Sequence, residues 1–162
     1  FMEEWLALYK SGSGERGIFN RQASKTVASR NKRRDADFEF GTNPCSEIIL
    51  RPFQFCNLSE VVVREGDTEE DLLDKVEAAT ILGTMQSTLT NFKYLRRQWK
   101  DTTEKERLLG VSLTGIMDHK ILSGNIHNTA VLIQLLKSMK QKAIDVNKII
   151  TFVELEEIRK IH

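Results

Sequence analysis

The stretch that decides the fold runs from Gly41 to Arg64 and reads GTNPCSEIILRPFQFCNLSEVVVR. From Ile48 onward it is rich in β-branched and aromatic residues, which predicts extended segments interrupted at Pro52. Residues 61–63 (VVV) are expected to form a strand. The same stretch contains both cysteines and both prolines of the chain, so it is also the first place to look for a site.

Periodic patterns on either side of this stretch predict an α/β domain, because strands alternate with helices. The expected elements are a helix over 1–10 that ends in the glycine-rich SGSGERG, a helix from about 68 to 91, a strand over 109–113 that ends beneath a turn at Gly115, and a helix over about 128–150. Asp67 or Thr68 is expected to cap the second helix, with Glu70 or Asp71 at the third position after the cap. The last helix carries an apolar stripe that should be buried: Leu132, Leu135, Leu136, Met139, Ala143, Val146 and Ile150.

Composition sets limits on the function. A chain of 162 residues with 40% hydrophobic and 29% charged residues is typical of one globular domain. A net charge of +1 gives no reason to expect nucleic acid or a membrane as partner. No apolar run approaches the roughly 20 residues that cross a bilayer, and the start FMEEWLALYK has acids where a signal peptide is basic. We therefore expect a cytoplasmic protein, and two cysteines without a CxxC motif fit a reducing compartment.

Two sets of polar residues are assigned no chemistry. The three histidines, His119, His127 and His162, lie far apart without paired carboxylates or cysteines, so packing is expected rather than metal ligation, and no metal site is predicted. The basic cluster is interpreted as a solvated face and consists of Arg30, Lys32, Arg33 and Arg34.

Asn43, Cys45 and Glu47 have the spacing of a chemical site. Pro44 restricts the residue before it to extended geometry, and residues two apart in an extended segment point to the same side, about 6 to 7 Å from neighbour to neighbour. Such a site would suit a polyhydroxylated ring such as a sugar. The amide can hydrogen-bond a hydroxyl group, the sulfur lies in the centre, and the carboxylate can accept a hydroxyl proton. We therefore expect these three side chains to line one face of an extended loop.

Two other interpretations of the cysteines stay open on spacing alone. In the first interpretation, Cys45 and Cys56 are small buried apolar residues, and Glu47 is an exposed charge at the end of a loop. In the second they form a disulfide that closes a short loop, as a redox step rather than a structural feature.

The segment FGTNPCSEIILRPFQFCNLSEVVVR closely resembles the radical-cysteine segment of ribonucleotide reductases, most of all the adenosylcobalamin-dependent (class II) ribonucleoside-triphosphate reductases. GERGIFNR is similar to the family's GEPGIFNR loop, with Arg16 where proline is usual, and ERLLGVSLTGIMDH is similar to its strand-and-turn segment. The resemblance covers about residues 1–148. The eleven-residue separation of Cys45 and Cys56 also resembles class II, since class I large subunits place the second cysteine further along the chain.

The resemblance implies a role for each residue of the motif. Cys45 matches the cysteine that becomes a thiyl radical and removes the ribose 3' hydrogen, Glu47 the general base at the 3' hydroxyl, and Asn43 the amide that binds the sugar hydroxyls. Cys56 matches one of the two redox-active cysteines that reduce the substrate. The substrate-binding loop comprises Asn43, Pro44, Cys45, Ser46 and Glu47.

The resemblance also implies a larger assembly than this chain. The family builds the site in a ten-stranded α/β barrel, with the radical cysteine on a finger loop, so residues 1–150 are expected to form part of the catalytic barrel and 151–162 a divergent tail. Adenosylcobalamin would be bound mainly by parts outside this chain. A thioredoxin-type reductant, deoxynucleotide effectors and the remaining reductase segments are the implied partners.

Two alternatives to a class II reductase segment remain. The first is a class I-type large subunit that acts on diphosphates with a separate radical-generating subunit. The second is a non-catalytic remnant or interaction module that keeps the packing without the activity.

Overall fold

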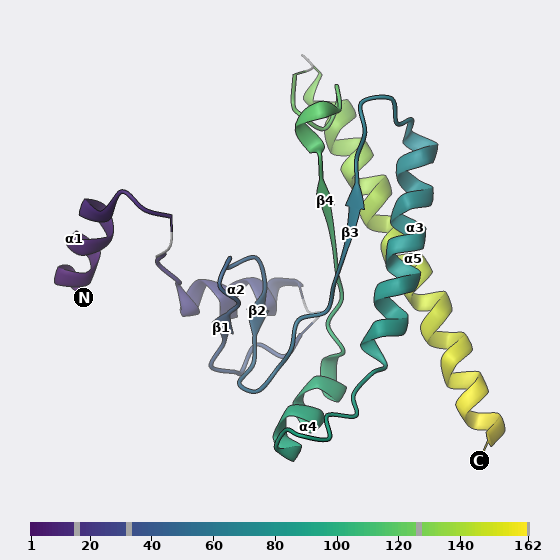
Figure 1. Cartoon of the computed structure of the whole chain (residues 1–162), viewed down its shortest axis with the longest axis horizontal. Helices are drawn as coiled ribbons and strands as arrows, with labels where there is room; N and C mark the ends of the chain where they lie inside the picture. Colours follow the sequence, from purple (N-terminus) through teal and green to yellow (C-terminus); the bar gives the residue numbers. More distant parts are fainter. Residues whose placement is uncertain (15–16, 32–33, 126–127, 162) are drawn as a thin grey trace. The chain divides into compact units, whose positions relative to one another are not determined.

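The computed structural model describes residues 1–14, 17–31, 34–125 and 128–161, and their side chains apart from those of residues 31 and 153–161. The chain forms two compact units, residues 1–54 and residues 55–162. The structure is a mixture of helices and two small sheets, as expected for part of an α/β protein (Figure 1). No helix in the described ranges is long and apolar enough to cross a membrane.

The first unit contains two helices and a short hairpin. The predicted N-terminal helix is confirmed as α1 and ends at Gly12, whose φ of 59° is left-handed. The elements are α1 (Met2–Ser11), α2 (Arg21–Asn31), β1 (Gly41–Thr42) and β2 (Ile49–Leu50). β1 and β2 pair in antiparallel fashion, with Thr42 opposite Ile49.

Helix α2 was not predicted from the sequence. Its residues, RQASKTVASRN, are mostly polar, and Ala28 is its one buried apolar side chain among those described, so no apolar period marks it. The helix is instead started by Asn20, whose side-chain oxygen accepts the N–H of Ala23 at 2.9 Å. An asparagine cap of this kind satisfies one of the free N–H groups of the first turn.

The second unit is a two-stranded parallel sheet covered by two long helices. β3 pairs with β4 so that Val61 lies opposite Leu113. The predicted strands are confirmed, although β3 begins three residues earlier than expected and Val63 adds one further hydrogen bond to Thr114. The elements are β3 (Leu58–Val62), α3 (Glu69–Ser87), α4 (Arg97–Glu106), β4 (Gly110–Thr114), the short 3₁₀ helix η1 (Ile116–Asp118) and α5 (Thr129–Ile161).

Helices α3 and α5 lie side by side over one face of this sheet (Figure 1). Side chains from both strands and both helices form a single core, which includes Val61, Val63, Leu72, Val76, Leu122, Leu135 and Met139. Helix α3 approaches the chain before β4 closely at Gly83, where a Cβ would lie 2.3 Å from Leu109 Cδ1 and would force that side chain to shift.

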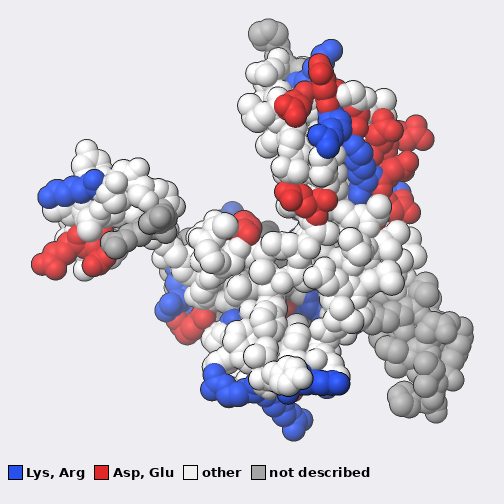
Figure 2. All heavy atoms as spheres, in the orientation of Figure 1, with Lys and Arg blue, Asp and Glu red and all other residues white. Residues whose placement is uncertain are grey.

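The start of α3 agrees with the predicted capping box. Thr68 is the N-cap, its hydroxyl accepts the Asp71 N–H at 3.2 Å, and the Asp71 carboxylate accepts the Thr68 N–H at 2.9 Å. Figure 2 shows acidic residues gathered on the surface around this helix. In the sequence, the first three turns of the helix contain five acidic residues. Negative charge at a helix N-terminus is stabilised by the helix dipole.

The end of α3 comes at Ser87, four residues before the predicted end near 91. Ser87 Oγ donates to the Thr84 carbonyl at 2.6 Å, and Thr88 Oγ1 donates to the Met85 carbonyl at 2.8 Å. These hydroxyl groups satisfy carbonyls of the last turn, which lets the helix stop there.

Helix α5 is longer than predicted and continues to Ile161. Leu135, Met139 and Val146 are buried, and Leu132 and Ala143 pack against the core. The expectation for Leu136 is wrong, because its side chain is 44% exposed. Leu136 follows Leu135 directly, and one residue turns an α-helix by about 100°, which takes it off the buried face.

Helix α4 was also missed. Its sequence, RQWKDTTEKE, has few apolar residues, and Thr103 is its one fully buried side chain. Contacts of its aromatic residue hold it in place instead, since the rings of Trp99 and Phe55 stack with centroids 4.6 Å apart. A single aromatic anchor leaves no periodic pattern in the sequence.

Candidate active site

The loop between β1 and β2 carries Cys45 at the tip of a hairpin. Its backbone closes on itself through two hydrogen bonds, from Asn43 N–H to Ile48 O at 3.4 Å and from Ser46 N–H to Asn43 O at 3.0 Å. Ser46 has a φ of 64°, in the left-handed region. The expectation that residues 43–47 are extended is therefore wrong, because a left-handed residue and an internal turn reverse the chain where a period of two would need it straight.

The turn nevertheless brings two of the predicted site residues into contact. The side-chain amide of Asn43 donates a hydrogen bond to Glu47 Oε1, and its Oδ1 accepts the Ile48 N–H at 3.1 Å. The backbone N–H of Ile48 can only donate, so it fixes the amide orientation that aims the NH₂ group at Glu47. The carboxylate is thereby held next to an amide, in the same loop as the thiol.

The outer part of the loop faces solvent. Pro44, Cys45, Ser46 and Glu47 are exposed, while Asn43 is half-buried. Cys45 is a free thiol, which argues against the interpretation of it as a small buried hydrophobe. An exposed thiol beside an amide and a carboxylate can meet a substrate or a radical donor that approaches from outside.

The base of the hairpin is held by Arg34, a side chain that the sequence analysis assigned to a solvated basic face. Arg34 donates to the Ile49 carbonyl at 2.7 Å and to Gln54 Oε1 at 3.3 Å, and its guanidinium lies 5.0 Å from the centre of the Phe40 ring. The interpretation of Arg34 as part of a solvated face is therefore wrong. Arg30 of the same cluster is exposed, whereas Lys32 and Arg33, like Arg16 in the preceding loop, lie outside the described residues.

Cys56 lies in the second unit, immediately before β3. It is a free, half-buried thiol at the wall of a pocket of about 260 Å³. Polar side chains from α3, α4 and the segment before β4 share this wall, including Gln86, Thr103 and Arg107. Both cysteines are free thiols in the structure, and a joint site of Cys45 and Cys56 stays a prediction from the resemblance.

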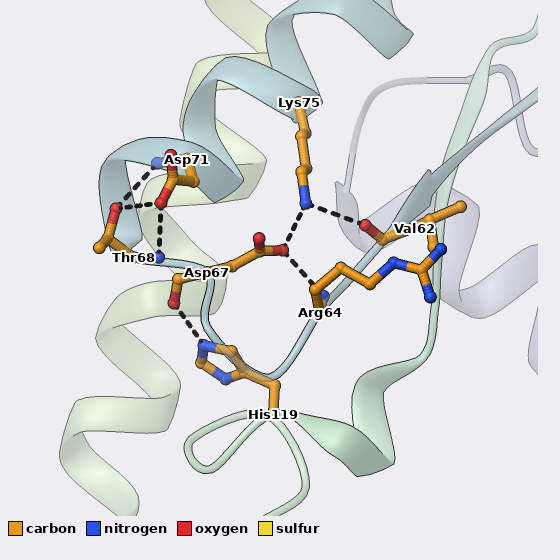
Figure 3. A network of polar contacts seen from close by, with 7 residues as sticks. All are labelled: Val62, Arg64, Asp67, Thr68, Asp71, Lys75 and His119. Carbon is orange, nitrogen blue, oxygen red and sulfur yellow. Dashed lines mark hydrogen bonds and ion pairs between the residues drawn. The ribbon is translucent and has the colours of Figure 1, made fainter.

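A polar network at the carboxyl ends of β3 and β4 accounts for His119 (Figure 3). Its Nε2 lies 3.1 Å from the Asp67 carbonyl, and its Nδ1 accepts the N–H groups of Ile121 and Leu122, each at 3.2 Å. Because Nδ1 accepts, Nε2 carries the proton and donates to Asp67. The predicted packing role of His119 is confirmed, and it ties the turn after β4 to the loop before α3.

Asp67 is the centre of the same network. Its carboxylate accepts from Lys75 Nζ at 2.6 Å and from the Arg64 N–H at 2.9 Å, and Lys75 also donates to the Val62 carbonyl at 3.1 Å (Figure 3). The hydrogen bond from Lys75, followed by that from Arg64, lowers the pKa of Asp67 below its ordinary value. Charge pairing of this kind stabilises the turn, with no sign of catalysis.

Metal binding finds no support in the part of the chain that the structure describes, which contains no cluster of His, Cys, Asp or Glu able to hold an ion. The predictions for His127 and His162 concern residues outside that part.

No family model matches the chain, and no solved structure does. Curated relatives do match. A protein of Lacticaseibacillus paracasei is 35% identical over 121 residues, which cover 70% of this chain and 15% of the relative. A protein of Lactobacillus leichmannii is 34% identical over 110 residues, which cover 65% of this chain and 14% of the relative. A protein of Lactobacillus helveticus is 30% identical over 122 residues, which cover 69% of this chain and 16% of the relative.

All three relatives are named adenosylcobalamin-dependent ribonucleoside-triphosphate reductase. This chain spans about 15% of the length of the relative from Lacticaseibacillus paracasei. The chain is therefore homologous to a segment of the adenosylcobalamin-dependent ribonucleoside-triphosphate reductases, which confirms the resemblance drawn from its motifs.

Proposed function

We propose that this chain is a catalytic segment of a reductase that converts ribonucleoside triphosphates to 2'-deoxyribonucleotides by a thiyl-radical mechanism. The observation that carries the proposal is the hairpin loop, in which an exposed thiol, an amide and a carboxylate stand within five residues and the amide contacts the carboxylate. The names of the relatives favour the cobalamin class over a class I-type large subunit.

In this proposal Cys45, Glu47, Asn43 and Cys56 have different tasks. Cys45 takes the 3' hydrogen of the ribose and returns it at the end of the cycle. Glu47 accepts the proton of the 3' hydroxyl, and Asn43 orients both the carboxylate and the sugar hydroxyls. Cys56 supplies reducing equivalents together with a second cysteine from another part of the enzyme, and a thioredoxin-type protein restores the pair.

Adenosylcobalamin, when bound, supplies the radical that converts the Cys45 thiol to a thiyl. The exposure of Cys45 at a loop tip fits that need, since the sulfur is open to a donor outside its own segment. The residues that hold the cofactor, and those that bind deoxynucleotide effectors, are expected in parts of the enzyme beyond this chain.

The sheet of the second unit supports a place within a larger barrel. Parallel sheets are normally covered on both faces and contain more than two strands. The two-stranded sheet of this unit is therefore expected to be part of a larger sheet. The face of β3 that does not face the core carries the exposed residues Leu58, Glu60 and Val62, and the two apolar ones are each 44% exposed. We propose that residues 1–150 complete the ten-stranded barrel together with the remaining segments, in the cytoplasm, with 151–162 as a divergent tail.

The test separates the roles of the two cysteines in a reconstituted enzyme. Cys45→Ser should abolish both deoxynucleotide formation and exchange of the 3' hydrogen, because the hydroxyl O–H bond is too strong to take part. Cys56→Ser should retain 3' hydrogen abstraction and release free base from the derailed intermediate. If both variants lost abstraction equally, the assignment of separate roles would be wrong.

A second experiment tests the reading of the chain as a segment. The 162-residue chain alone should be inactive, and mixing with the remaining segments should give reduction that depends on adenosylcobalamin. Turnover by the purified chain alone would contradict the proposal, and a mixture that binds but never turns over would favour a non-catalytic module.

A further inference from the structure

The hairpin that presents Cys45 is too short to hold its own position. β1 and β2 contain two residues each, and an isolated two-stranded hairpin is marginal even at greater length. The hydrogen bonds of Asn43 organise the tip of the loop, but they do not fix the hairpin to the rest of its unit. A separate contact must do so.

Arg34 makes that contact from the opposite edge of β2. Asn43 N–H bonds to Ile48 O, and carbonyl directions alternate along an antiparallel strand, so the next carbonyl, that of Ile49, faces away from β1. Arg34 Nη1 donates to this carbonyl at 2.7 Å. The guanidinium therefore satisfies a carbonyl that the hairpin leaves open.

The same guanidinium reaches both ends of the hairpin. Its Nη2 donates to Gln54 Oε1, four residues after β2, and the same oxygen accepts the Arg51 N–H at 2.9 Å. Its Cζ lies over the ring of Phe40, the residue directly before β1, 5.0 Å from the ring centre. Phe40 is fully buried and Gln54 is 6% exposed, so Arg34 joins two buried anchors on either side of the loop.

This geometry needs arginine rather than any cation. A planar fork can donate in two directions and stack on a ring at the same time, whereas a lysine ammonium is a point charge on a flexible stem. The ion pairs of Glu39 with Arg21 and Lys25 in the same unit differ, since their carboxylate is 65% exposed, and such surface pairs contribute little.

We propose that Arg34 is a positioning residue for Cys45: its guanidinium fixes the base of the hairpin and thereby the place of the thiol. The inference rests on the proposed function, in which Cys45 is the reacting group. Because misplacement of a reacting group by about 1 Å can cost about a hundredfold in rate, loosening the base should lower turnover without any contact between Arg34 and substrate.

The test uses the complete polypeptide encoded by the gene and compares Arg34→Lys and Arg34→Met. The control is Arg30→Lys, at an exposed position of α2 in the same unit. Hydrogen exchange is measured on the peptide that covers residues 41–50, and steady-state reduction is measured on the same samples. Both Arg34 variants should speed exchange of the Ser46 and Ile48 amides by about tenfold or more, and Arg30→Lys should not.

Turnover should respond mainly in kcat. In Arg34→Lys we expect kcat to fall by about tenfold or more and the KM for the nucleotide to change by less than kcat does, since Arg34 does not contact the substrate in this proposal but does fix the place of the thiol. A purely structural role predicts loss of folded enzyme instead, with the specific activity of the folded fraction unchanged, and that result would overturn the proposal.

Failure of the proposed function looks different from failure of the inference. Unchanged exchange in both Arg34 variants would refute the role of Arg34 whatever the enzyme does. Faster exchange with unchanged kcat would also refute it, because placement would then not matter. Activity that survives Cys45→Ser would refute the proposed function itself, while leaving the exchange result as it stands.

Discussion

Asn43 donates a hydrogen bond from its side-chain amide to the carboxylate of Glu47, across a turn that has Cys45 at its tip. The amide cannot rotate to present its oxygen instead, since that oxygen accepts the Ile48 N–H at 3.1 Å. One side chain thus sets both the shape of the loop and the partner of the carboxylate. The loop combines an amide held by two hydrogen bonds, an exposed carboxylate and an exposed thiol.

Glu47→Gln should retain the loop but remove the carboxylate that is proposed to act as the base. Glutamine is nearly isosteric, and its carbonyl oxygen can still accept the hydrogen bond from Asn43. We expect substrate to bind as before while the reduction rate falls by about 10² to 10⁴, the usual range for loss of a general base. Single-turnover kinetics with a parallel binding assay measure this, and near-normal turnover would make Glu47 structural.

Ser46 should respond to substitution according to its left-handed backbone. At a φ of 64° a β-branched residue is disfavoured by about 1–2 kcal/mol relative to glycine. Ser46→Gly should therefore keep or strengthen the hairpin, and Ser46→Val should weaken it. Exchange protection of the Ile48 amide compares the two variants, and equal protection in both would mean that the turn changes its conformation on substitution.

Gly115 should not tolerate alanine. Its φ is 72°, and a Cβ there would lie 2.4 Å from the carbonyl oxygen of Val63. Val63 continues the pairing of β3 with β4, because its N–H donates to the Thr114 carbonyl. Gly115→Ala should lower the free energy of unfolding by about 1–3 kcal/mol. Urea unfolding measures the loss.

The matched control for Gly115 is Gly66→Ala, because nothing lies within 4 Å of a Cβ at Gly66. We expect that variant to change the free energy of unfolding by less than about 0.5 kcal/mol. Equal effects of the two substitutions would show that space and backbone angle at Gly115 do not matter.

Asp67 should make stability depend on pH in the acid range. Hydrogen bonds from Lys75 and then Arg64 lower the pKa of Asp67 in the folded protein, so its stabilisation is complete above the ordinary aspartate value of about 3.9. It is lost as the pH falls through the lowered folded-state pKa. Asp67→Asn should thus be less stable than the parent at neutral pH, and the difference should shrink in acid.

Urea midpoints at several pH values test this dependence, with Glu65→Gln as an exposed control in the same loop. The control should follow the parent at every pH. A difference between Asp67→Asn and the parent that persists unchanged at about pH 2 would mean that the carboxylate charge is not the stabilising element.

Local sequence was enough to predict the elements of the second unit that have strong periods. The Thr68–Asp71 capping box lies within four residues, and β3, β4, α3 and α5 repeat their apolar residues at the spacing of a strand or a helix. These signals depend only on which neighbours share a face. Helices α2 and α4 carry no such pattern and were therefore missed.

The candidate site divides in the same way. The sequence by itself determined which residues to examine, because the NPCSE motif and its resemblance name Asn43, Cys45 and Glu47. Only the tertiary structure decided their arrangement: a left-handed Ser46 and two hydrogen bonds within the loop replace the expected straight segment. The role of Arg34 was likewise invisible, since its partners Ile49 and Gln54 lie 15 and 20 residues away, and contacts at such separations are set by folding rather than by local spacing.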